Sequence, residues 1–343
     1  MKTKVAILFG GQSTEHEVSR ASASSVLRNI NQQKFDVYPI GITKDGRWFE
    51  YTGEIDNIES GKWEEDAFYK KPEGEKILFN KEVDVVFPVL HGLYGEDGTI
   101  QGICKLLNLP CVGPGVMSSA VCMDKVYTKY VLEKFRIKQA DYVVVTEFGY
   151  KSNKEELINT IENKLGYDLF IKPSNSGSSV GITKAHNREE LIAGLEEALK
   201  YDRKILVEEA LNVREVEVAV LGNDEPKASI PGEIIPAKEF YDYEAKYENA
   251  ASKLLIPAAL SDEELENIRE IAVQVYKALD CAGMARVDFL VTKEEGEVYL
   301  NEVNTIPGFT SISMYPKMWE KTGITYTELI TKLIQFAIMR KNG

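Results

Sequence analysis

Residues 286–304 read Arg-Val-Asp-Phe-Leu-Val-Thr-Lys-Glu-Glu-Gly-Glu-Val-Tyr-Leu-Asn-Glu-Val-Asn, and this stretch decides the reading of the fold. It predicts two strands, over residues 285–291 and 297–303, because both segments are rich in β-forming residues such as Val, Phe and Tyr and are separated by a turn sequence. The intervening Lys293-Glu294-Glu295-Gly296 is a polar, glycine-containing turn, as expected for the loop of a β-hairpin.

Four polar side chains of this hairpin are expected to lie together. Successive side chains alternate between the two faces of a strand, so Arg286 and Asp288 share one face, as do Glu302 and Asn304. Carboxylate and amide oxygens are ligands that Mg²⁺ accepts beside the phosphates of a nucleotide, and an arginine suits a transferring phosphoryl group. The alternative is an ordinary solvated sheet face, and the hairpin alone does not decide between the two.

Composition and charge limit the classes of protein that this chain can belong to. The chain has 343 residues, of which 44% are hydrophobic, which suits a globular protein of two or three domains. A net charge of −13 argues against nucleic acid or an anionic membrane as partner. The first apolar run breaks at Gly10-Gly11 without a cleavage site, so we expect a first strand, no signal peptide and a cytoplasmic location.

Cysteine and histidine usage points away from disulfides and zinc. Cys104, Cys111, Cys122 and Cys281 lack CxxC spacing and predict free, buried thiols in a reducing compartment. Three histidines scattered along the chain are too few for a zinc site.

The first third predicts an α/β domain with a parallel sheet. Strands are expected at Val5–Phe9, Phe35–Ile42 and Val83–Val89, with a helix over Glu15–Asn29 after the first of them. The charged, weakly patterned segment Glu54–Lys76 is interpreted as a surface insertion.

The remainder predicts two further α+β domains, with boundaries near residues 113 and 211, giving domains 1–113, 114–211 and 212–343. The expected helices are Ser118–Phe135, Lys154–Leu165, Arg188–Lys200, Asp262–Leu279 and Tyr326–Met339. The expected strands, besides the hairpin, are Tyr142–Val145, Leu169–Lys172, Lys204–Glu208, Glu215–Leu221 and Ala228–Ile230.

A second chemical signal is the loop Lys172-Pro-Ser-Asn-Ser-Gly-Ser-Ser-Val-Gly181. Its backbone N–H groups, small hydroxyl side chains and two glycines suit a loop over the phosphates of ATP. It is not a Walker A sequence, and a hairpin linker has a similar composition.

Acidic residues and glycines gather at further turns. Glu208, Glu209 and Glu215 flank the second boundary and could accept hydrogen bonds from adenine and ribose, or be ordinary surface carboxylates. Glu15 opens a helix after Gly10-Gly11, where it could hold a substrate ammonium or cap the helix.

Two more loops have functional and structural interpretations. The loop from His91 to Gly102 follows a strand, where ligands of α/β sheets bind, although a polar turn before a helix explains most of it. The segment from Glu239 to Tyr247 is polar and aromatic, which suits an active-site lid or a surface patch for a partner.

Taken together, these motifs resemble the D-alanine–D-alanine ligases of the ATP-grasp superfamily, in the family's order and over nearly the whole chain. The motifs are Gly10-Gly11 with Glu15-His-Glu-Val-Ser19, the His91 loop, the Lys172 loop, Tyr243-Glu-Ala-Lys-Tyr247, Arg286-Val-Asp288 and Asn301-Glu-Val-Asn-Thr-Ile-Pro-Gly-Phe-Thr-Ser311.

The resemblance implies a three-domain ATP-grasp fold and a role for each matching residue. For ATP it implies phosphate contacts from Lys125, Lys172 and nearby Lys246, adenine contacts from Glu208, Glu209 and Leu211, and a ribose contact from Glu215. For metal it implies two Mg²⁺ ions, for which Mn²⁺ can substitute, on Asp288, Glu302 and Asn304. For the first D-alanine it implies that Glu15 binds the ammonium group, that His91 lies nearby, and that Arg286 and the Gly308 N–H stabilise the charge that develops in the reaction. It implies that Ser178 and Tyr247 close the lid over Glu15. For the second D-alanine it implies that Ser313 and the Met314 backbone bind the carboxylate group.

The implied reaction is ATP-dependent joining of two D-alanine molecules through a D-alanyl phosphate, in a homodimeric enzyme of peptidoglycan precursor synthesis. Related resistance ligases make D-alanyl-D-lactate or D-alanyl-D-serine, but Tyr247 and Met314 depart from the residues that those enzymes often carry. A non-catalytic nucleotide-binding regulator is the alternative from another class, and the presence of Asp288 and Glu302 argues against it.

Overall fold

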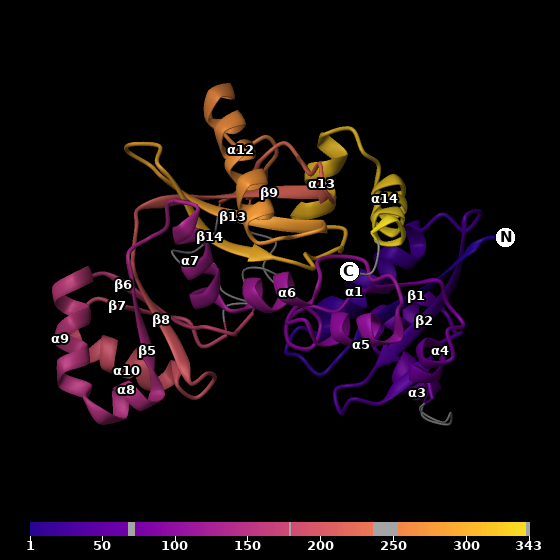
Figure 1. Cartoon of the computed structure of the whole chain (residues 1–343), viewed down its shortest axis with the longest axis horizontal. Coiled ribbons are helices and arrows are strands. Elements are labelled where there is room, and N and C mark those ends of the chain that lie inside the picture. The colour runs from indigo at the N-terminus through magenta and orange to yellow at the C-terminus, as the bar shows by residue number, and fades with distance from the viewer. Residues whose placement is uncertain (68–72, 178–179, 236–252, 341–343) are drawn as a thin grey trace.

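The structure is a computed structural model that describes residues 1–67, 73–177, 180–235 and 253–340. Three β-sheets, formed by successive parts of the chain, lie in three lobes (Figure 1). Each sheet falls within one of the three expected domains, and the expected α/β class, with α+β lobes after the first, is confirmed. Both ends of the described chain lie on the side of the first lobe (Figure 1).

The first sheet has the order β3-β2-β1-β4. Its strands are β1 (Thr3–Gly10), β2 (Phe35–Ile42), β3 (Trp48–Glu50) and β4 (Val85–Pro88). The expected parallel sheet is confirmed for β2, β1 and β4, whereas β3 is antiparallel, so the sheet is mixed. Helices α1 (His16–Asn29) and α5 (Thr99–Leu107) follow β1 and β4 and place the two loops that precede them at the carboxyl ends of these strands.

The segment predicted as a surface insertion, Glu54–Lys76, is partly core. It contains α2 (Ile55–Ser60), α3 (Trp63–Ala67) and the start of α4 (Glu75–Phe79). Trp63 is fully buried and its ring packs edge-on against Phe9, with 5.0 Å between centroids. The surface prediction was therefore wrong for α3, because one large aromatic anchors an otherwise charged helix.

The second sheet is antiparallel throughout and has the order β5-β8-β6-β7. Its strands are β5 (Tyr142–Thr146), β6 (Leu169–Pro173), β7 (Thr183–Ala185) and β8 (Lys204–Glu209). Helices α8 (Glu147–Ser152), α9 (Lys154–Leu165) and α10 (Arg188–Ala198) pack on this sheet around a common apolar core (Figure 1).

The single helix predicted over Ser118–Phe135 is two helices, α6 (Val116–Met123) and α7 (Lys125–Lys134). The break is at Asp124, whose side chain caps α7 by accepting from the Tyr127 N–H and also accepts from Ser174. Cys122 and Leu132, one from each helix, join the apolar core of the third sheet and not that of the second. The domain boundaries themselves stay predictions.

The third sheet has the order β12-β11-β9-β13-β14, with β10 paired to β9. Its strands are β9 (Val213–Gly222), β10 (Lys227–Ala228), β11 (Gly232–Ile235), β12 (Lys253–Leu255), β13 (Gly283–Thr292) and β14 (Val298–Asn304). One face carries valines of β9 and β13 against α12 (Asp262–Ala278), which begins at a Ser261/Glu264 capping box. The opposite face carries the polar side chains described below.

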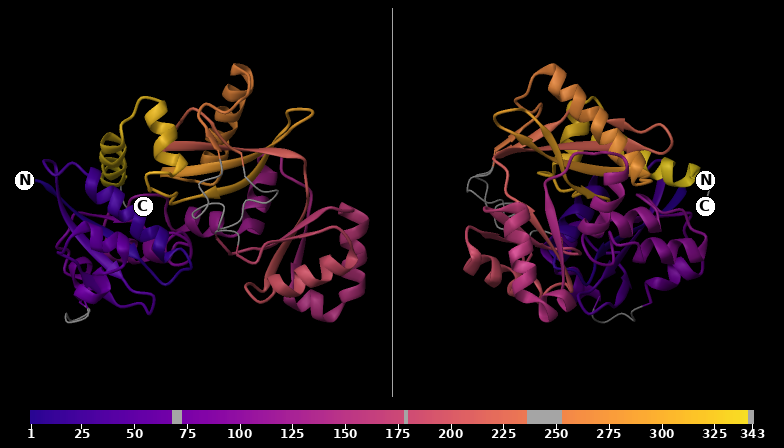
Figure 2. Two further views of the ribbon diagram at one scale, coloured as in Figure 1. Left: turned by 180° about the vertical axis from the view of Figure 1, so that it is seen from behind. Right: turned by 60° about the vertical axis from the view of Figure 1, so that its left-hand side comes forward.

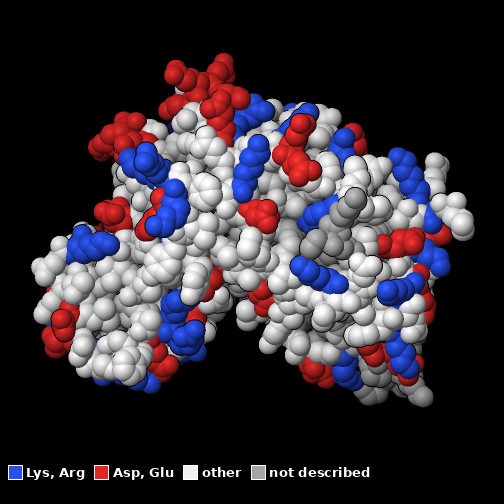
Figure 3. Space-filling model, in the orientation of Figure 1, with Lys and Arg blue, Asp and Glu red and all other residues white. Residues whose placement is uncertain are grey.

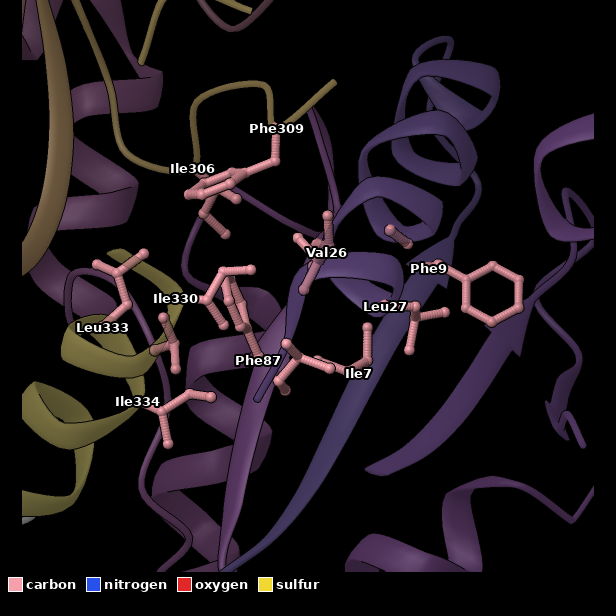
Figure 4. Close-up of a cluster of buried hydrophobic side chains, with 14 of the residues drawn as sticks. Ile7, Phe9, Val26, Leu27, Phe87, Ile306, Phe309, Ile330, Leu333 and Ile334 are labelled. Atoms are coloured by element: carbon pink, nitrogen blue, oxygen red, sulfur yellow. The ribbon is translucent and has the colours of Figure 1, made fainter. Parts of the chain in front are cut away.

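A continuous apolar cluster joins the first and third sheets. Helices α13 (Met314–Lys321) and α14 (Tyr326–Met339) lie between these sheets (Figure 2). In Figure 4, Ile306 and Phe309 point into the same cluster as Phe87 of β4, Val26 of α1 and Ile330 of α14. The chain that follows β14 is therefore held against the first lobe by apolar packing.

Among the described residues, no helix is long and apolar enough to cross a membrane.

Candidate active site

The polar face of the third sheet brings the expected hairpin side chains together. β13 and β14 pair with Arg286 opposite Asn304 and Asp288 opposite Glu302, which brings together the four side chains that were expected to lie close to one another. β9 adds a residue that the sequence analysis missed, because Glu217 lies opposite Asp288 on the other side of β13.

The hydrogen bonds on this face centre on Asp288. Arg286 donates to both Asp288 oxygens, from Nε at 2.8 Å and from a terminal nitrogen at 2.7 Å, and Asn304 Nδ2 donates at 2.9 Å. Arg286 also lies 3.1 Å from Glu217. Burial alone would lower the pKa of Arg286, but the charges of Asp288 and Glu217 raise it above its usual range.

The burial of its charged side chains distinguishes this face from an ordinary solvent-exposed sheet face. Asp288 is 8% exposed and Glu217 is 7% exposed. Charged groups are seldom buried to this extent unless they are paired or serve a ligand, so the solvated-face alternative does not describe this sheet.

A second ionic cluster connects the second sheet to β14. Glu208 on β8 lies 2.6 Å from Lys172 of β6 and 2.6 Å from Lys129 of α7, and Lys172 also donates to Asn301 at 3.3 Å. Burial would raise the pKa of Glu208, but the two ammonium groups lower it to about 2. The charge of Glu208 also raises the pKa of Lys172, against the effect of burial. Lys129 was missed because nothing in a helical sequence pattern marks a buried lysine.

Lys125 connects the first turn of α7 to both the glycine-rich loop and the hairpin. Its Nζ donates to the Ser176 carbonyl at 2.8 Å and lies 3.6 Å from Glu302. Lys125 and Lys172 therefore both lie beside β14, on the side of the polar face.

The fit of a metal can be judged from these donors. Within the described part of the chain, no group of three or more His, Cys, Asp or Glu side chains forms a ready metal cage. The face instead offers two carboxylates, Asp288 and Glu302, and the Asn304 amide. This set fits Mg²⁺, which commonly takes one or two protein carboxylates and completes its shell with waters and substrate phosphates.

A second group of residues surrounds Glu15, which is buried at the start of α1. A Cβ atom built on Gly92 or Gly177 would come within 2.6 or 2.7 Å of Glu15 Oε2, so both loops approach this carboxylate closely. Glu15 occupies the N-cap position, yet its side chain accepts no capping hydrogen bond, so the capping alternative is wrong. The loops after β1, β4 and β6 thus converge on one carboxylate.

His91 lies behind this carboxylate. Its Nδ1 is 2.9 Å from the Ile306 carbonyl and its Nε2 is 2.9 Å from Ser22 Oγ. Burial lowers the pKa of His91, so the ring is neutral near pH 7. Both ring nitrogens are used by the protein.

Glu96 is a second residue that the sequence analysis did not select. Its carboxyl oxygens accept from the Gly92 N–H at 2.8 Å and from the Ile306 N–H at 3.0 Å. Burial, together with the charge of Glu15, raises the pKa of Glu96 to about 8. The only sequence signal was its place in the glycine-rich loop after β4.

Gly308 and Ser313 are adjacent in the loop between β14 and α13. A Cβ on Gly308 would lie 2.7 Å from Ser313 Oγ, which also accepts from the Thr310 N–H at 3.0 Å. The Met314 side chain is buried against Gly232, where a Cβ would meet its Cε at 2.3 Å. The Met314 side chain therefore belongs to the apolar cluster, and the role expected for the Met314 backbone stays a prediction.

The remaining candidates are residues around the end of β8 and the start of β9, and three residues outside the described part of the chain. Glu209 accepts from the Asp141 N–H at 2.8 Å, Leu211 is half-buried after β8, and Glu215 pairs opposite Leu290 in β9 and β13. Ser178, Lys246 and Tyr247 lie outside the described residues.

On the surface, Figure 3 shows side chains of both charges, with acidic groups gathered over one end of α12. The surface is hollowed between the lobes of the first and second sheets (Figure 3).

Two family models match most of the chain. A model described as D-ala D-ala ligase N-terminus matches residues 4–114, and one described as D-ala D-ala ligase C-terminus matches residues 131–335.

Similar curated proteins and solved structures agree with these matches. The D-alanine–D-alanine ligases of Clostridium novyi and Clostridium acetobutylicum are each 76% identical to this chain, over the full length of both sequences. The VanG D-Ala:D-Ser ligase of Enterococcus faecalis matches with a TM-score of 0.87 and 42% identity, over 98% of this chain and 100% of that one. The D-alanine–D-alanine ligase of Coxiella burnetii matches with a TM-score of 0.83 and 35% identity, over 98% and 94% of the two chains. The chain belongs to the D-alanine–D-alanine ligase family.

Proposed function

We propose that this protein joins two D-alanine molecules at the expense of ATP, giving D-alanyl-D-alanine, ADP and phosphate through a D-alanyl phosphate intermediate. The observation that carries the proposal is the buried polar face of β9, β13 and β14, with two lysines directed to it from α7 and β6. It is the arrangement that a phosphoryl transfer between ATP and a carboxylate requires.

The need for ATP follows from the chemistry of the carboxylate. A free carboxylate is a poor acyl donor because oxide would have to leave. Transfer of the γ-phosphoryl group to the first D-alanine gives an acyl phosphate, whose phosphate group can leave when the amine of the second D-alanine attacks. Water would destroy the same intermediate, so the site must exclude it.

On the ATP side, Lys125 and Lys172 contact the phosphates, and Glu208, which also pairs with Lys129, holds Lys172 charged and in place. Glu208, Glu209 and Leu211 contact adenine, and Glu215 contacts ribose. Asp288, Glu302 and Asn304 would hold two Mg²⁺ ions, for which Mn²⁺ can substitute, and these ions would neutralise charge on the transferring phosphoryl group.

On the amino-acid side, Glu15 holds the ammonium of the first D-alanine, and Arg286 and the Gly308 N–H stabilise the oxyanion that forms at its carbonyl carbon. Ser313 and the Met314 N–H bind the carboxylate of the second D-alanine. This assignment draws support from the position of both residues at the N-terminus of α13, because the first turn of a helix offers unpaired N–H groups and favours negative charge.

Residues outside the described part complete the proposal. Ser178 and Tyr247 close the lid over Glu15, and Lys246 lies near the phosphates. The product would enter peptidoglycan precursor synthesis in the cytoplasm, and we propose that the enzyme is a homodimer.

The proposal is tested by incubating purified protein with ATP, Mg²⁺ and D-alanine, and measuring phosphate and dipeptide in the same samples. One dipeptide per phosphate supports the proposal. ADP formation with another acid and no dipeptide from D-alanine would refute it.

A further inference from the structure

The turn Ile306–Phe309, which carries the proposed oxyanion donor, is held by side chains from the first lobe. The Ile306 N–H donates to Glu96 at 3.0 Å, and the Ile306 carbonyl lies 2.9 Å from His91 Nδ1. The Phe309 N–H donates to Ser22 Oγ at 3.1 Å. Both ends of the turn are thus fixed by residues of α1 and of the loop after β4.

The direction of each hydrogen bond around Ser22 follows from the chemistry of its partners. A carbonyl can only accept, so His91 Nδ1 carries the proton that it donates to Ile306. Burial lowers the pKa of His91, so its Nε2 is unprotonated and accepts from the Ser22 hydroxyl. The result is a directed chain from the Phe309 N–H through Ser22 and His91 to the Ile306 carbonyl, which closes around the turn.

This series of hydrogen bonds leaves one backbone N–H group of the turn for a ligand. Pro307 has no N–H, and the N–H groups of Ile306 and Phe309 are both used. Within the described part of the chain, the Gly308 N–H donates to no protein acceptor. The Ile306 and Phe309 side chains on either side are fixed in the apolar cluster of Figure 4.

We propose that Ser22 is a positioning residue for the reaction, acting with His91 to hold the Gly308 N–H at the place where the oxyanion forms. This inference rests on the proposed function, and it extends the site to a residue of α1. Ser22 is fully buried, and its hydroxyl group satisfies one donor and one acceptor at the same time.

The expected defect is specific to the second half of the reaction. Removing the hydroxyl leaves the Phe309 N–H and His91 Nε2 without their partner, so the turn can shift. A displaced Gly308 N–H slows attack of the second amine on the acyl phosphate, while phosphoryl transfer depends on Lys125, Lys172 and the hairpin. The acyl phosphate then persists until it leaves the site, and in solution water attacks its acyl carbon, the carbon–oxygen bond to phosphate breaks, and D-alanine and phosphate form without dipeptide.

The test compares Ser22→Ala with Ser24→Ala, a matched control. Ser24 is equally buried on the same helix, but its hydroxyl only reaches the Ile55 carbonyl at 3.5 Å, away from the turn. Phosphate and dipeptide are measured together. For Ser22→Ala we expect dipeptide kcat to fall about tenfold, the equivalent of one lost hydrogen bond, and phosphate per dipeptide to rise well above one. Ser24→Ala should keep the ratio at one.

A second variant keeps the proposal testable if one substitution unfolds the protein. His91→Ala should raise the same ratio, and the double variant should be no worse than the poorer single variant, because both act through one chain of hydrogen bonds. A ratio of one in Ser22→Ala, or additive losses in the double variant, would overturn the proposal.

Amide hydrogen exchange separates this proposal from the proposed function. In protein without substrates, a peptide covering Ile306–Thr310 should exchange faster in Ser22→Ala than in wild type or Ser24→Ala. Unchanged exchange refutes the positioning role whatever reaction the enzyme catalyses. If the wild type forms no dipeptide, the proposed function is refuted. The positioning role of Ser22 is then tested by the hydrogen-exchange measurement alone.

Discussion

Replacing Glu208 with glutamine should destabilise the fold by an amount that the structure allows us to work out. Glu208 is buried between two ammonium groups, each 2.6 Å away. The two lysines lower its pKa from 4.5 to about 2. At 1.36 kcal/mol per pH unit, this shift corresponds to about 3 kcal/mol of stability from the ionised carboxylate. Glutamine keeps the shape but removes the carboxylate charge that Lys129 and Lys172 share.

The sign of the pH dependence adds a second check. Because the pKa of Glu208 is lowered on folding, its contribution is complete above pH 4.5 and is lost as pH falls toward 2. The difference in unfolding free energy between wild type and Glu208→Gln should therefore be about 3 kcal/mol at pH 7 and roughly half of that near pH 3.

The assay is urea unfolding followed by circular dichroism at both pH values. Glu297→Gln is the matched control, because Glu297 pairs with Lys138 at 2.5 Å but both side chains are 46% exposed. Solvent screens an exposed pair of this kind, so Glu297→Gln should change the free energy of unfolding little at either pH. A loss below 1 kcal/mol for Glu208→Gln at pH 7, or a difference that does not narrow in acid, would refute the reasoning.

Three further predictions follow from the site. Folding raises the pKa of Glu96 from 4.5 to about 8, so the contribution of the protonated carboxyl group to stability is complete below pH 4.5 and is lost as pH rises through 8. Between pH 6 and 8.5, the unfolding free energy of wild type should therefore fall by roughly 2–3 kcal/mol more than that of Glu96→Gln. The same pH dependence of urea unfolding in both proteins would contradict this. Glu302→Ala should abolish turnover with the melting temperature little changed, because it removes a proposed metal ligand, and near-normal turnover at saturating Mg²⁺ would refute the assigned role. Tyr247→Phe should raise the use of D-lactate relative to D-alanine as second substrate, and an unchanged ratio across pH would count against the lid assignment.

The parts of the fold that the sequence predicted well are those whose pattern is local. Val5–Phe9 was found as a strand because a continuous apolar run ends at Gly10-Gly11, and the hairpin at 286–304 was found because its turn sequence is explicit. The helix break at Asp124 was missed because it depends on Ser174, a partner 50 positions away in sequence. Trp63 was assigned to the surface because burial of one aromatic in a charged segment is a tertiary property.

The candidate site likewise contains residues that could be selected from the sequence and residues that could not. Residues inside recognisable motifs, such as Asp288 and Glu302, could be selected from sequence and are brought together by strand pairing. Lys129, Glu96, Glu217 and Ser22 could not, because each acts through partners far away in sequence and looks ordinary within its own helix, loop or strand. Their roles became visible only once burial and hydrogen-bond partners were known.

The central claim is tested most directly by competition between possible second substrates. Purified protein is given ATP, Mg²⁺ and equal concentrations of D-alanine, D-serine and D-lactate, and the products are identified by mass spectrometry. D-alanyl-D-alanine should be the main product, formed with one phosphate per molecule. A majority of D-alanyl-D-serine or D-alanyl-D-lactate, or phosphate release without any of the three products, would contradict the account.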